Sequence, residues 1–578
     1  MRICHRRPAP VSSLAASLLL LGACGGGGSS SPIVILPPGG GNPPPAASPC
    51  TLSVGAGSEL QCQLAKSAPA DAVALSGAPL GMVALPSGKI RWSPLSHQVG
   101  VYTITASVGG TSQQFTVTVT AGAAAAAGLY VAPGGDDGAA GTAAAPLRTL
   151  DRAARLATPG TTIFMRGGLY RNAEYGQPYG GRTSANFVRI TSSGTASAPI
   201  TIRPNGNEIV RIESDVNGIV FANANYWVVD GLELVGNAAT LSYDSAMSAW
   251  WTENNHQFGG RGIVNNGAQH IVVRNNIVHD FPDAGISATD ADWITVSGNI
   301  VYNNAWWTIS GVNGVTNSRL LTTDPASAND EKMLIENNLV FANQSLIISH
   351  VFSKGSVSLV LDEGNGLHLQ NNSATYSGRS RVEGNVMLFN GKGGLGLNTI
   401  DQVTVRNNVF YRNARVVDVA ELVIQSSTLD GAAGNLFQPR TERATIKDFQ
   451  RSFANIGSNA TTGAARDGGD YPSVVRLSTV FRDPAALDFR PANGVPAGMG
   501  VPDATLNLLF GKAADYGIAI AEPTQIVDSA YLSAMITRIF ATWPASHSTI
   551  QLEDRNRGYT YSYAQRCQWP NAPSASPC

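Results

Sequence analysis

The sequence predicts an all-β protein whose largest part is a solenoid, a stack of short β coils. The first observation is a recurring phrase in which an Asn-Asn or Gly-Asn pair precedes two large apolar residues. It occurs at residues 275–278, 298–301, 337–340, 384–387, 407–410 and 434–437. The spacing is 23 residues twice, and 39, 47 and 27 residues in between, as expected if loops are inserted into a common coil. Asn tolerates left-handed turns and its amide can bond a stacked neighbour, so these pairs predict the turns.

The second observation is a column of Gly-led strands that begins 13 residues before the Asn column in three coils. Side chains alternate between the two faces of a strand. The alternation places an apolar ladder inside the coils, made of Ile219, Ile263, Ile286, Leu367 and Leu395. It places Val264, Ser287, His368 and Gly396 on the outer face, together with Asn266, Thr289, Gln370 and Asn398. We therefore expect one sheet with a polar outer surface, on which Gln370 and Asn398 can contact a substrate.

The composition fits an exported, turn-rich protein. Charged residues make up 14% of the chain, against a typical quarter, and there are 62 glycines. The net charge is −1, so no global field attracts nucleic acid or an acidic polymer, and local cations or a metal must hold any polyanion.

The N-terminus predicts export and a lipid anchor. Residues 1–24 combine a basic start with a short apolar core, too short to span a membrane. The ending Leu-Gly-Ala-Cys, followed by a Gly/Pro/Ser linker at 25–48, resembles a bacterial lipoprotein signal. The resemblance implies that Cys24 is lipidated and that the protein is held at the cell envelope, in the outer membrane or at the cell surface. A plain secretory signal is the alternative.

Four further cysteines predict two local disulfides in an oxidising compartment, Cys50 with Cys62 and Cys567 with Cys578. Residues 49–121 alternate like strands and resemble bacterial Ig-like modules of the cadherin type, in the stretches 77–82, 86–88, 92–94 and 99–100. We expect a small β-sandwich there, followed by an Ala-rich linker at 122–128.

The main domain is expected at 129–495. Its opening (130–135, 146–150, 163–168) contains one amphipathic helix at 150–157, which would cap the exposed strand edges of the solenoid. This opening and the closing segments 481–484 and 488–491 resemble right-handed parallel β-helix proteins, especially polysaccharide lyase family 9. Residues 496–578 are expected to form a C-terminal cap, with a helix at 529–543 over the last coil.

Long insertions at 239–261, 311–332, 343–363 and 371–380 flank the polar sheet and predict a binding groove, since long solenoid loops usually build one. The aromatic candidates for stacking on sugars are Trp250, Trp251, Trp306, Trp307 and Tyr376. Pinning of the loops is the alternative role for the tryptophans.

Residues 361–369 have the densest group of candidate catalytic residues, because they place two carboxylates beside an imidazole that points outward. Family 9 lyases have a similar Gly-Asn-Gly-apolar-basic stretch, in which a lysine is the base and aspartates hold calcium. The matching residue here is His368, and the family's aspartate cluster is not evident. The resemblance implies β-elimination on an acidic polysaccharide, pectate- or alginate-like. The expected base is His368, with Lys392 in reserve. We expect Arg379 or Arg381 to bind the substrate carboxylate. The expected calcium ligands are Asp362, Glu363 and Asp283.

Two other classes stay open. A glycoside hydrolase needs two carboxylates across a sugar, and Asp283 with Asp362 or Glu363 could serve. A lipid-anchored binding or adhesive protein would need no clustered ionisable residues on one sheet. In each case we expect the protein to be a monomer.

Overall fold

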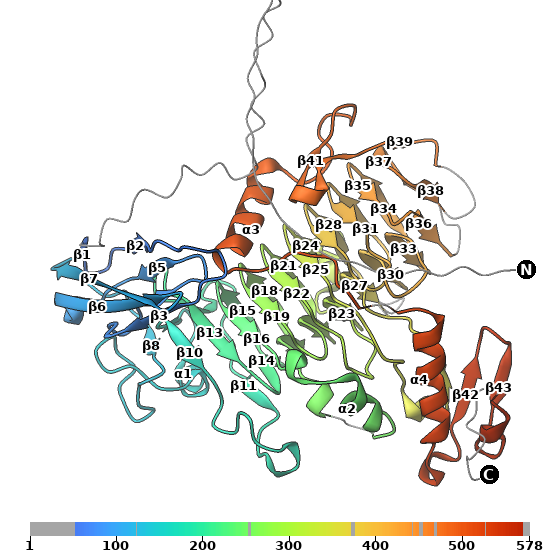
Figure 1. Ribbon diagram of the computed structural model, residues 1–578, viewed down its shortest axis with the longest axis horizontal. Coiled ribbons are helices and arrows are strands. Elements are labelled where there is room, and N and C mark those ends of the chain that lie inside the picture. The colour runs from blue at the N-terminus through green and yellow to red at the C-terminus, as the bar shows by residue number, and fades with distance from the viewer. Residues whose placement is uncertain are drawn as a thin grey trace, which may run out of the picture. The chain divides into compact units, whose positions relative to one another are not determined.

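A computed structural model describes residues 52–122, 124–252, 256–370, 376–441, 443–449, 455–466, 471–525 and 527–569. Its main part is a parallel β-helix, in which three sheets run along the stack of coils (Figure 1). Each full coil passes through the back sheet, then the side sheet, then the front sheet. We call the two connections that matter here the back–side corner and the side–front corner.

The front sheet has ten strands: β11 (Asn186–Ile190), β14 (Asn217–Ala222), β17 (Ile263–Asn266), β20 (Ile286–Thr289), β23 (Val315–Ser318), β27 (Leu367–Gln370), β30 (Leu395–Asn398), β33 (Leu422–Gln425), β36 (Ala444–Asp448) and β38 (Ala464–Arg466). The side sheet has eleven: β10 (Gly168–Tyr170), β13 (Val210–Glu213), β16 (Glu233–Val235), β19 (Ile277–His279), β22 (Ile300–Tyr302), β25 (Leu339–Phe341), β29 (Val386–Leu388), β32 (Val409–Tyr411), β35 (Leu436–Gln438), β37 (Asn459–Thr461) and β39 (Val474–Arg476). The back sheet has ten: β8 (Leu129–Val131), β9 (Thr162–Met165), β12 (Ile200–Pro204), β15 (Asn225–Asp230), β18 (Gln269–Arg274), β21 (Asp292–Ser297), β24 (Glu331–Glu336), β28 (Arg379–Glu383), β31 (Val403–Arg406) and β34 (Leu429–Ala433).

The recurring Asn pairs form the back–side corner, as predicted. The first residue of each pair has a positive φ, for example 56° at Asn275 and Asn337 and 67° at Gly384. The second residue is a buried Asn whose amide donates to the Asn of the next coil, as from Asn338 to Asn385 at 2.9 Å. This back–side ladder consists of Asn276, Asn299, Asn338, Asn385, Asn408, Asn435 and Asn459.

A second asparagine ladder, which the sequence analysis missed, lies at the side–front corner. It consists of Asn304, Asn343, Asn390 and Asn413 and ends on the carboxylate of Glu421. Both ladders satisfy amides inside the coils, where an unpaired polar group would be costly.

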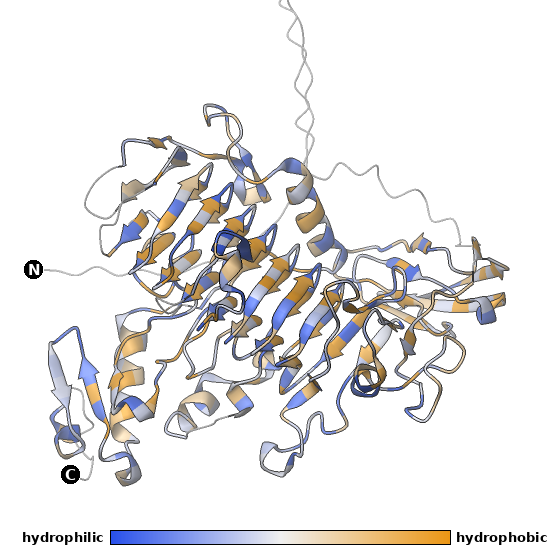
Figure 2. Cartoon of the chain, turned by 180° about the vertical axis from the view of Figure 1, so that it is seen from behind, coloured by the Kyte–Doolittle hydropathy of each residue, from blue (hydrophilic) through white to orange (hydrophobic). Residues whose placement is uncertain are grey.

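The interior of the β-helix is apolar, and the predicted ladder residues Ile219, Ile263, Ile286, Leu367 and Leu395 all lie in it. Figure 2 shows hydrophobic residues recurring along the stacked strands. The helix α1 (Leu150–Leu156) buries Leu150, Ala153 and Ala154 in the same core, beside the first strands. This confirms the predicted helix and its place at the end of the stack.

The N-terminal module has two sheets around one core, with residues such as Trp92 and Phe115 at its centre. One sheet contains β1 (Leu52–Gly55), β7 (Thr111–Thr120), β6 (Gly100–Val108) and β3 (Val73–Ser76), and the other β2 (Leu60–Gln63), β5 (Lys89–Trp92) and β4 (Val83–Ala84). This is a small β-sandwich, as predicted. Its assignment to the Ig-like modules stays a prediction.

The C-terminal segment returns to the middle of the β-helix, and the prediction that its helix covers the last coil is wrong. The helix α4 (Ser529–Ala541) packs on loops of the side–front corner, where the Tyr531 hydroxyl donates to the Leu346 carbonyl at 2.7 Å. It lies beside α2 (Tyr243–Ser248), and Arg538 is 2.6 Å from Asp244 (Figure 1). The strand β42 (Gln551–Asp554) pairs with β26 (Ser356–Ser358) and with β43 (Tyr559–Tyr561).

A helix that the sequence analysis did not predict, α3 (Asp503–Asp515), packs with Leu506 and Leu509 against the side sheet. The hairpin of β40 (Phe481–Asp483) and β41 (Asp488–Pro491) shares this cluster through Phe481 and Phe489. Among the described residues, no helix is long and apolar enough to cross a membrane.

The predicted signal, Cys24, the linker, Cys50 and Cys578 lie outside the described residues. Cys62 is buried on β2, and Cys567 lies in a short 3-10 helix at Tyr563–Gln568. The lipid anchor and both disulfide pairings therefore stay predictions.

Candidate active site

The outer face of the front sheet carries a polar row in strand register. Successive strands pair so that neighbouring members of the row lie side by side, as Gln370 does with Asn398. The row consists of Asn266, Thr289, Ser318, Gln370, Asn398 and Gln425, all exposed or half-buried. The predicted contacts Gln370 and Asn398 are therefore placed where a bound chain could run across the strands.

The predicted base, His368, faces away from the interior core but is covered by the loops of the side–front corner. Its Nδ1 lies 2.8 Å from the Asn313 side-chain nitrogen. The Asn313 oxygen accepts from the backbone N–H groups of Gly364 and Asn365 and from the Asn365 amide, at 3.2, 2.7 and 2.8 Å. These three donors fix the orientation of the Asn313 amide, so its NH₂ group donates to His368 and Nδ1 is the acceptor.

His368 is consequently a neutral imidazole that carries its proton on Nε2. Burial, and then the charge of Lys392, lowers the pKa of His368 to about 3. The one basic nitrogen is already used by Asn313, so His368 does not have the free lone pair that a general base needs. This arrangement argues against His368 as the base, and that role stays a prediction.

Glu363, predicted as a calcium ligand, has the properties of a base instead. Its side chain is 17% exposed, and its Oε2 lies 3.7 Å from His368 Nδ1. That oxygen is buried and has no hydrogen-bond partner among the described residues. Burial, opposed by the charge of Lys392, raises the pKa of Glu363 to about 7. A carboxyl group with a near-neutral pKa is suited to proton transfer at neutral pH.

Lys392 is the cation of the same corner. Its backbone N–H donates to the Gly364 carbonyl at 2.9 Å, which stacks it directly on the Glu363 segment. Its ammonium donates to the carbonyl and the carboxylate of Asp362, at 2.5 and 2.9 Å. Asp362 is 59% exposed, so Lys392 is held near the surface by a partner that solvent can reach.

The predicted substrate arginines lie elsewhere. Arg379 and Arg381 belong to β28 in the back sheet, not to the front sheet. Arg379 pairs with Asp430, and Arg381 pairs with Glu331, Glu336 and Glu383. Ion pairs along the outer face of the back sheet are a structural role, so neither arginine can hold a substrate carboxylate next to Glu363.

The predicted calcium ligands do not form one set. The Asp283 carboxylate is buried and bonded to Arg261 at 2.9 Å and to the Thr308 hydroxyl at 2.9 Å, and Asp362 is paired with Lys392. Of the three, Glu363 has a buried oxygen without a hydrogen-bond partner among the described residues. Calcium takes six to eight oxygen ligands. No group of three or more His, Cys, Asp or Glu side chains suited to a metal occurs among the described residues. Asp283, Asp362 and Glu363 therefore do not together form a calcium site here, and calcium binding by the protein stays a prediction.

The four tryptophans pin the loops, which was the alternative role. Trp250, Trp251 and Trp307 are buried, and Trp306 is half-buried. Each indole N–H donates to a backbone carbonyl, for example from Trp250 to Ile348 at 2.8 Å. Tyr376 packs on the interior core, and its hydroxyl is 3.4 Å from the buried Asp292 carboxylate. Three of the tryptophan rings are thus buried and unsuited to sugar stacking, whereas Trp306 and Tyr376 are half-buried.

The sequence analysis missed a cluster of arginines on the same corner. Arg412, Arg415 and Arg440 all bind the carboxylate of Glu522, which comes from the C-terminal segment. The arginines follow two neighbouring side-sheet strands, so the sequence repeat could have predicted that they lie at the same corner. Glu522 could not, because it lies more than 80 residues away in the sequence.

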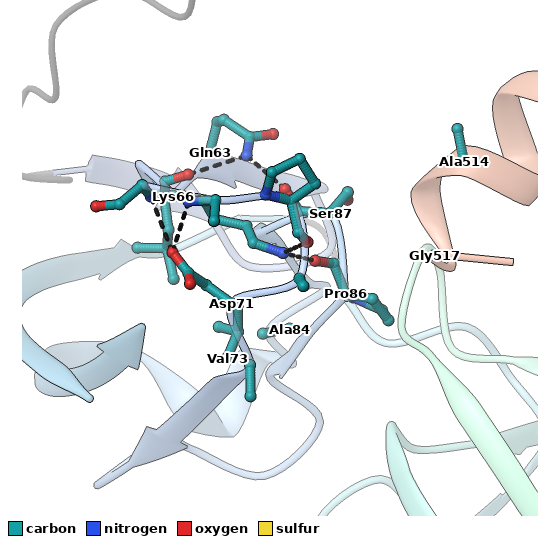
Figure 3. Close-up of a pocket in the computed structure, with 15 residues that line it drawn as sticks. Gln63, Lys66, Asp71, Val73, Ala84, Pro86, Ser87, Ala514 and Gly517 are labelled. Carbon is teal, nitrogen blue, oxygen red and sulfur yellow. Dashed lines mark hydrogen bonds between the residues drawn. The ribbon is translucent and has the colours of Figure 1, made fainter. Parts of the chain in front are cut away.

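A pocket in the N-terminal module is not a second candidate for the active site. Figure 3 shows Lys66 and Asp71 in it, with Ala514 and Gly517 on its far side. The Lys66 ammonium donates to the Pro86 carbonyl at 2.7 Å, and the Asp71 carboxylate accepts from the backbone of Ser67 and Ala68. Both charged groups are bonded to backbone groups of the module.

The family description "Pel9A-like, right handed beta helix region" matches residues 129–427, just over half of the chain. The chain belongs to this Pel9A-like family. The β-helix is accordingly right-handed, as the resemblance implied.

Several known proteins resemble parts of the Pel9A-like region. "Pectate lyase PEL9" of Emericella nidulans is 34% identical over 158 residues, which is 24% of this chain and 36% of that protein. "Uncharacterized protein YwoF" of Bacillus subtilis is 37% identical over 98 residues, or 17% of each chain. The match thus spans about a third or less of these curated relatives. The solved structure of pectate lyase Pel9A is 16% identical, with a TM-score of 0.36, over 64% of this chain and 91% of that one.

Proposed function

We propose that this protein is a polysaccharide lyase that cleaves a uronic-acid polymer by β-elimination. The observation that carries the proposal is that one corner of the front sheet holds both a buried carboxyl group, whose pKa is raised to about 7, and a lysine ammonium that the neighbouring Asp362 binds. β-Elimination requires both a base and a cation. The match to a protein named as a pectate lyase supports this reaction class.

Glu363 is the proposed base. Its carboxylate takes the proton from the sugar carbon next to the uronate carboxylate. The electron pair of that C–H bond forms the new carbon–carbon double bond, and the glycosidic oxygen on the neighbouring carbon leaves. The leaving oxygen takes up a proton from water or from the newly protonated Glu363. Neutral His368 lies beside Glu363 and adds no charge, so the charge of Lys392 favours the Glu363 carboxylate while the charge of Asp362 opposes it.

Lys392 is the proposed partner of the substrate carboxylate. Negative charge spreads onto that carboxylate as the proton leaves, and a nearby ammonium stabilises it. Asp362 holds the ammonium at the corner and competes for it. The polar row through Gln370 and Asn398 would contact hydroxyl groups of neighbouring sugars along the front sheet.

The experiment is a panel of polygalacturonate, alginate and neutral polysaccharides, followed by ultraviolet absorbance and by assay of reducing ends. Elimination creates an unsaturated uronate that absorbs in the ultraviolet, whereas hydrolysis creates reducing ends alone. We expect ultraviolet absorbance with an acidic polymer. Reducing ends without absorbance would favour hydrolysis by two carboxylates such as Asp362 and Glu363. Binding without cleavage would favour an adhesive role.

The proposal includes the anchor. Lipidation of Cys24 would hold the enzyme at the cell envelope, with the linker and the sandwich as spacers between the membrane and the β-helix. Metabolic labelling with a fatty acid, compared between the native chain and Cys24→Ala, tests this part, and unchanged labelling would contradict it.

A further inference from the structure

One carboxylate at the side–front corner is surrounded by three arginines. Arg412 donates from Nε to Glu522 Oε2 at 3.0 Å, and Arg415 and Arg440 both bind Oε1. We call Arg412, Arg415 and Arg440 the arginine triad. Arg412 and Arg440 are each about a third exposed, so solvent reaches the triad.

The triad has more positive charge than its partner requires. A single carboxylate balances the charge of one guanidinium, yet three guanidinium groups converge on Glu522, which leaves two positive charges in excess. The Nε of Arg415 is buried and has no hydrogen-bond partner among the described residues. Burial and the repulsion of Arg440 and Arg412 lower the pKa of Arg415, although Glu522 opposes this. Binding of Glu522 alone does not require three arginines whose positive charges repel one another.

Glu522 belongs to a strap that joins α3 to α4, and the strap is held mainly through its side-chain contacts. Arg415 also donates to the Pro523 carbonyl, and Ile520 is partly buried on the side-sheet cluster. Among the described residues, no main-chain hydrogen bond links residues 519–524 to the coils. The carboxylate can therefore leave the triad without breaking secondary structure.

The triad continues the proposed active corner. The loop that carries Arg412 and Arg415 stacks on the Lys392 segment, with the Ala414 N–H donating to the Lys392 carbonyl at 2.6 Å. Going along the stack, the corner presents Glu363, then Lys392, then the triad, so the cations are arranged in a row that starts at the base. An acidic polymer has one carboxylate on each sugar, and such a row matches a repeating negative charge.

We propose that the arginine triad is a carboxylate subsite for the acidic polymer, and that Glu522 occupies it as an internal competitor. When a uronate unit binds, its carboxylate replaces that of Glu522. This inference rests on the proposed function and adds a second contact point to it, beyond the reacting sugar.

The test is calorimetric binding of an oligogalacturonate in a Glu363→Gln background, which prevents turnover. Adding Glu522→Gln removes the competitor, and we expect about fivefold tighter binding at low salt, the effect of one partly exposed charge contact. Adding Arg412→Gln as well should cancel that gain. The methyl-esterified oligomer has no carboxylate charge, so its binding should not respond to either change.

Asp418→Asn is the matched control, since Asp418 is exposed and pairs with Arg443 at 2.7 Å on the same corner, outside the triad. It removes the same charge and should not improve binding as Glu522→Gln does. Unchanged binding by Glu522→Gln, or an equal gain with the methyl ester, would overturn the subsite. If Glu522→Gln does not fold, Arg440→Gln in the same background replaces it: about fivefold weaker binding supports the subsite, and unchanged binding overturns it.

Failure of the subsite and failure of the proposed function give different results. Elimination by the native chain, with binding insensitive to Glu522→Gln, overturns the subsite alone. An absence of both binding and cleavage for every acidic polymer tested overturns the proposed substrate class, and the subsite with it.

Discussion

The back–side corner and the side–front corner both bury polar side chains in successive coils, but only the first does so uniformly. At the back–side corner, each Asn of the ladder donates to the next and no amide of the ladder is left unpaired among the described residues. At the side–front corner the loops differ in length, and Glu363, Gln344 and Arg415 contain buried atoms without partners. Polar groups that repeat in each coil and are fully hydrogen-bonded build the coil, whereas polar groups that occur once and lack partners are the candidates for chemistry.

The largest expected effect is on turnover. Glu363→Gln keeps the shape of the side chain and removes the base, so we expect the rate of elimination to fall by about a thousandfold. The unfolding midpoint should not fall, since a neutral amide replaces a carboxyl group that burial already disfavours as an anion. Ultraviolet assay and thermal unfolding measure the two effects. Asp418→Asn, which removes an exposed carboxylate paired with Arg443 outside the proposed machinery, is the control, and a similar loss in both variants would contradict the assignment.

The second effect is on the pH profile. Because Glu363 must be deprotonated to act, kcat/KM should rise with pH and level off above about 7. Below that value the rate should fall about tenfold per pH unit. If kcat/KM rises only near pH 10, as for a lysine base, Lys392 rather than Glu363 would be the base. The unpaired Glu363 would then no longer distinguish the side–front corner by its chemistry.

The third effect concerns the saturated corner. Asn338→Ala breaks the back–side ladder and leaves the backbone N–H and the amide of Asn299 without their acceptor. We expect a loss of about 3 kcal/mol in the free energy of unfolding, since several buried groups become unpaired. Turnover per folded molecule should not change. Asn398→Ala, on the exposed polar row, should cost less than about 1 kcal/mol, and equal losses would show that the ladder is not special.

The fourth effect comes from the end of the second ladder. Burial raises the pKa of Glu421 to about 8, although its hydrogen bonds with Asn413 oppose this. The folded state therefore binds a proton that the unfolded state releases near 4.5, so this contribution is complete at low pH and is lost as pH rises through 8. The unfolding midpoint should fall between pH 5 and pH 9, and it should fall less in Glu421→Gln. If the unfolding midpoints of the native protein and of Glu421→Gln fall equally over this range, a group other than Glu421 causes the pH dependence.

The smallest effect is expected in the loops. Trp306→Phe removes the hydrogen bond from its indole to the Ala342 carbonyl, 3.2 Å away, and should cost about 1 kcal/mol in unfolding free energy. Substrate affinity should stay within twofold if Trp306 only pins the loop. A large loss of affinity, measured by calorimetry, would restore the predicted stacking role.

The coil could be predicted from the sequence because its determinants are local and repeated. The Asn pairs mark the turns, and strand alternation correctly sorted Leu367 inside and His368 outside. The site was predicted less well. Alternation says that His368 points outward, but not that the loop carrying Asn313 covers it.

The remaining errors come from contacts between distant segments. Nothing in residues 496–578 indicates that α4 packs on Trp250 and Trp251, or that Glu522 meets Arg440. The repeat sets the partners of each strand, whereas the loops and the C-terminal segment find theirs through shape and charge.

The asparagine ladders also bear on how such a chain can change its length. In the back–side ladder, each Asn from Asn299 to Asn435 accepts from the coil before it and donates to the coil after it, all in one direction. A duplicated or deleted coil would therefore leave both new neighbours correctly paired. Glu421 accepts at both oxygens and passes nothing on, so it acts as a terminator for its ladder. Gene-level duplication of single coils upstream of Glu421 could thus lengthen the front sheet, and with it the stretch of polymer that is held, without redesign of the interior.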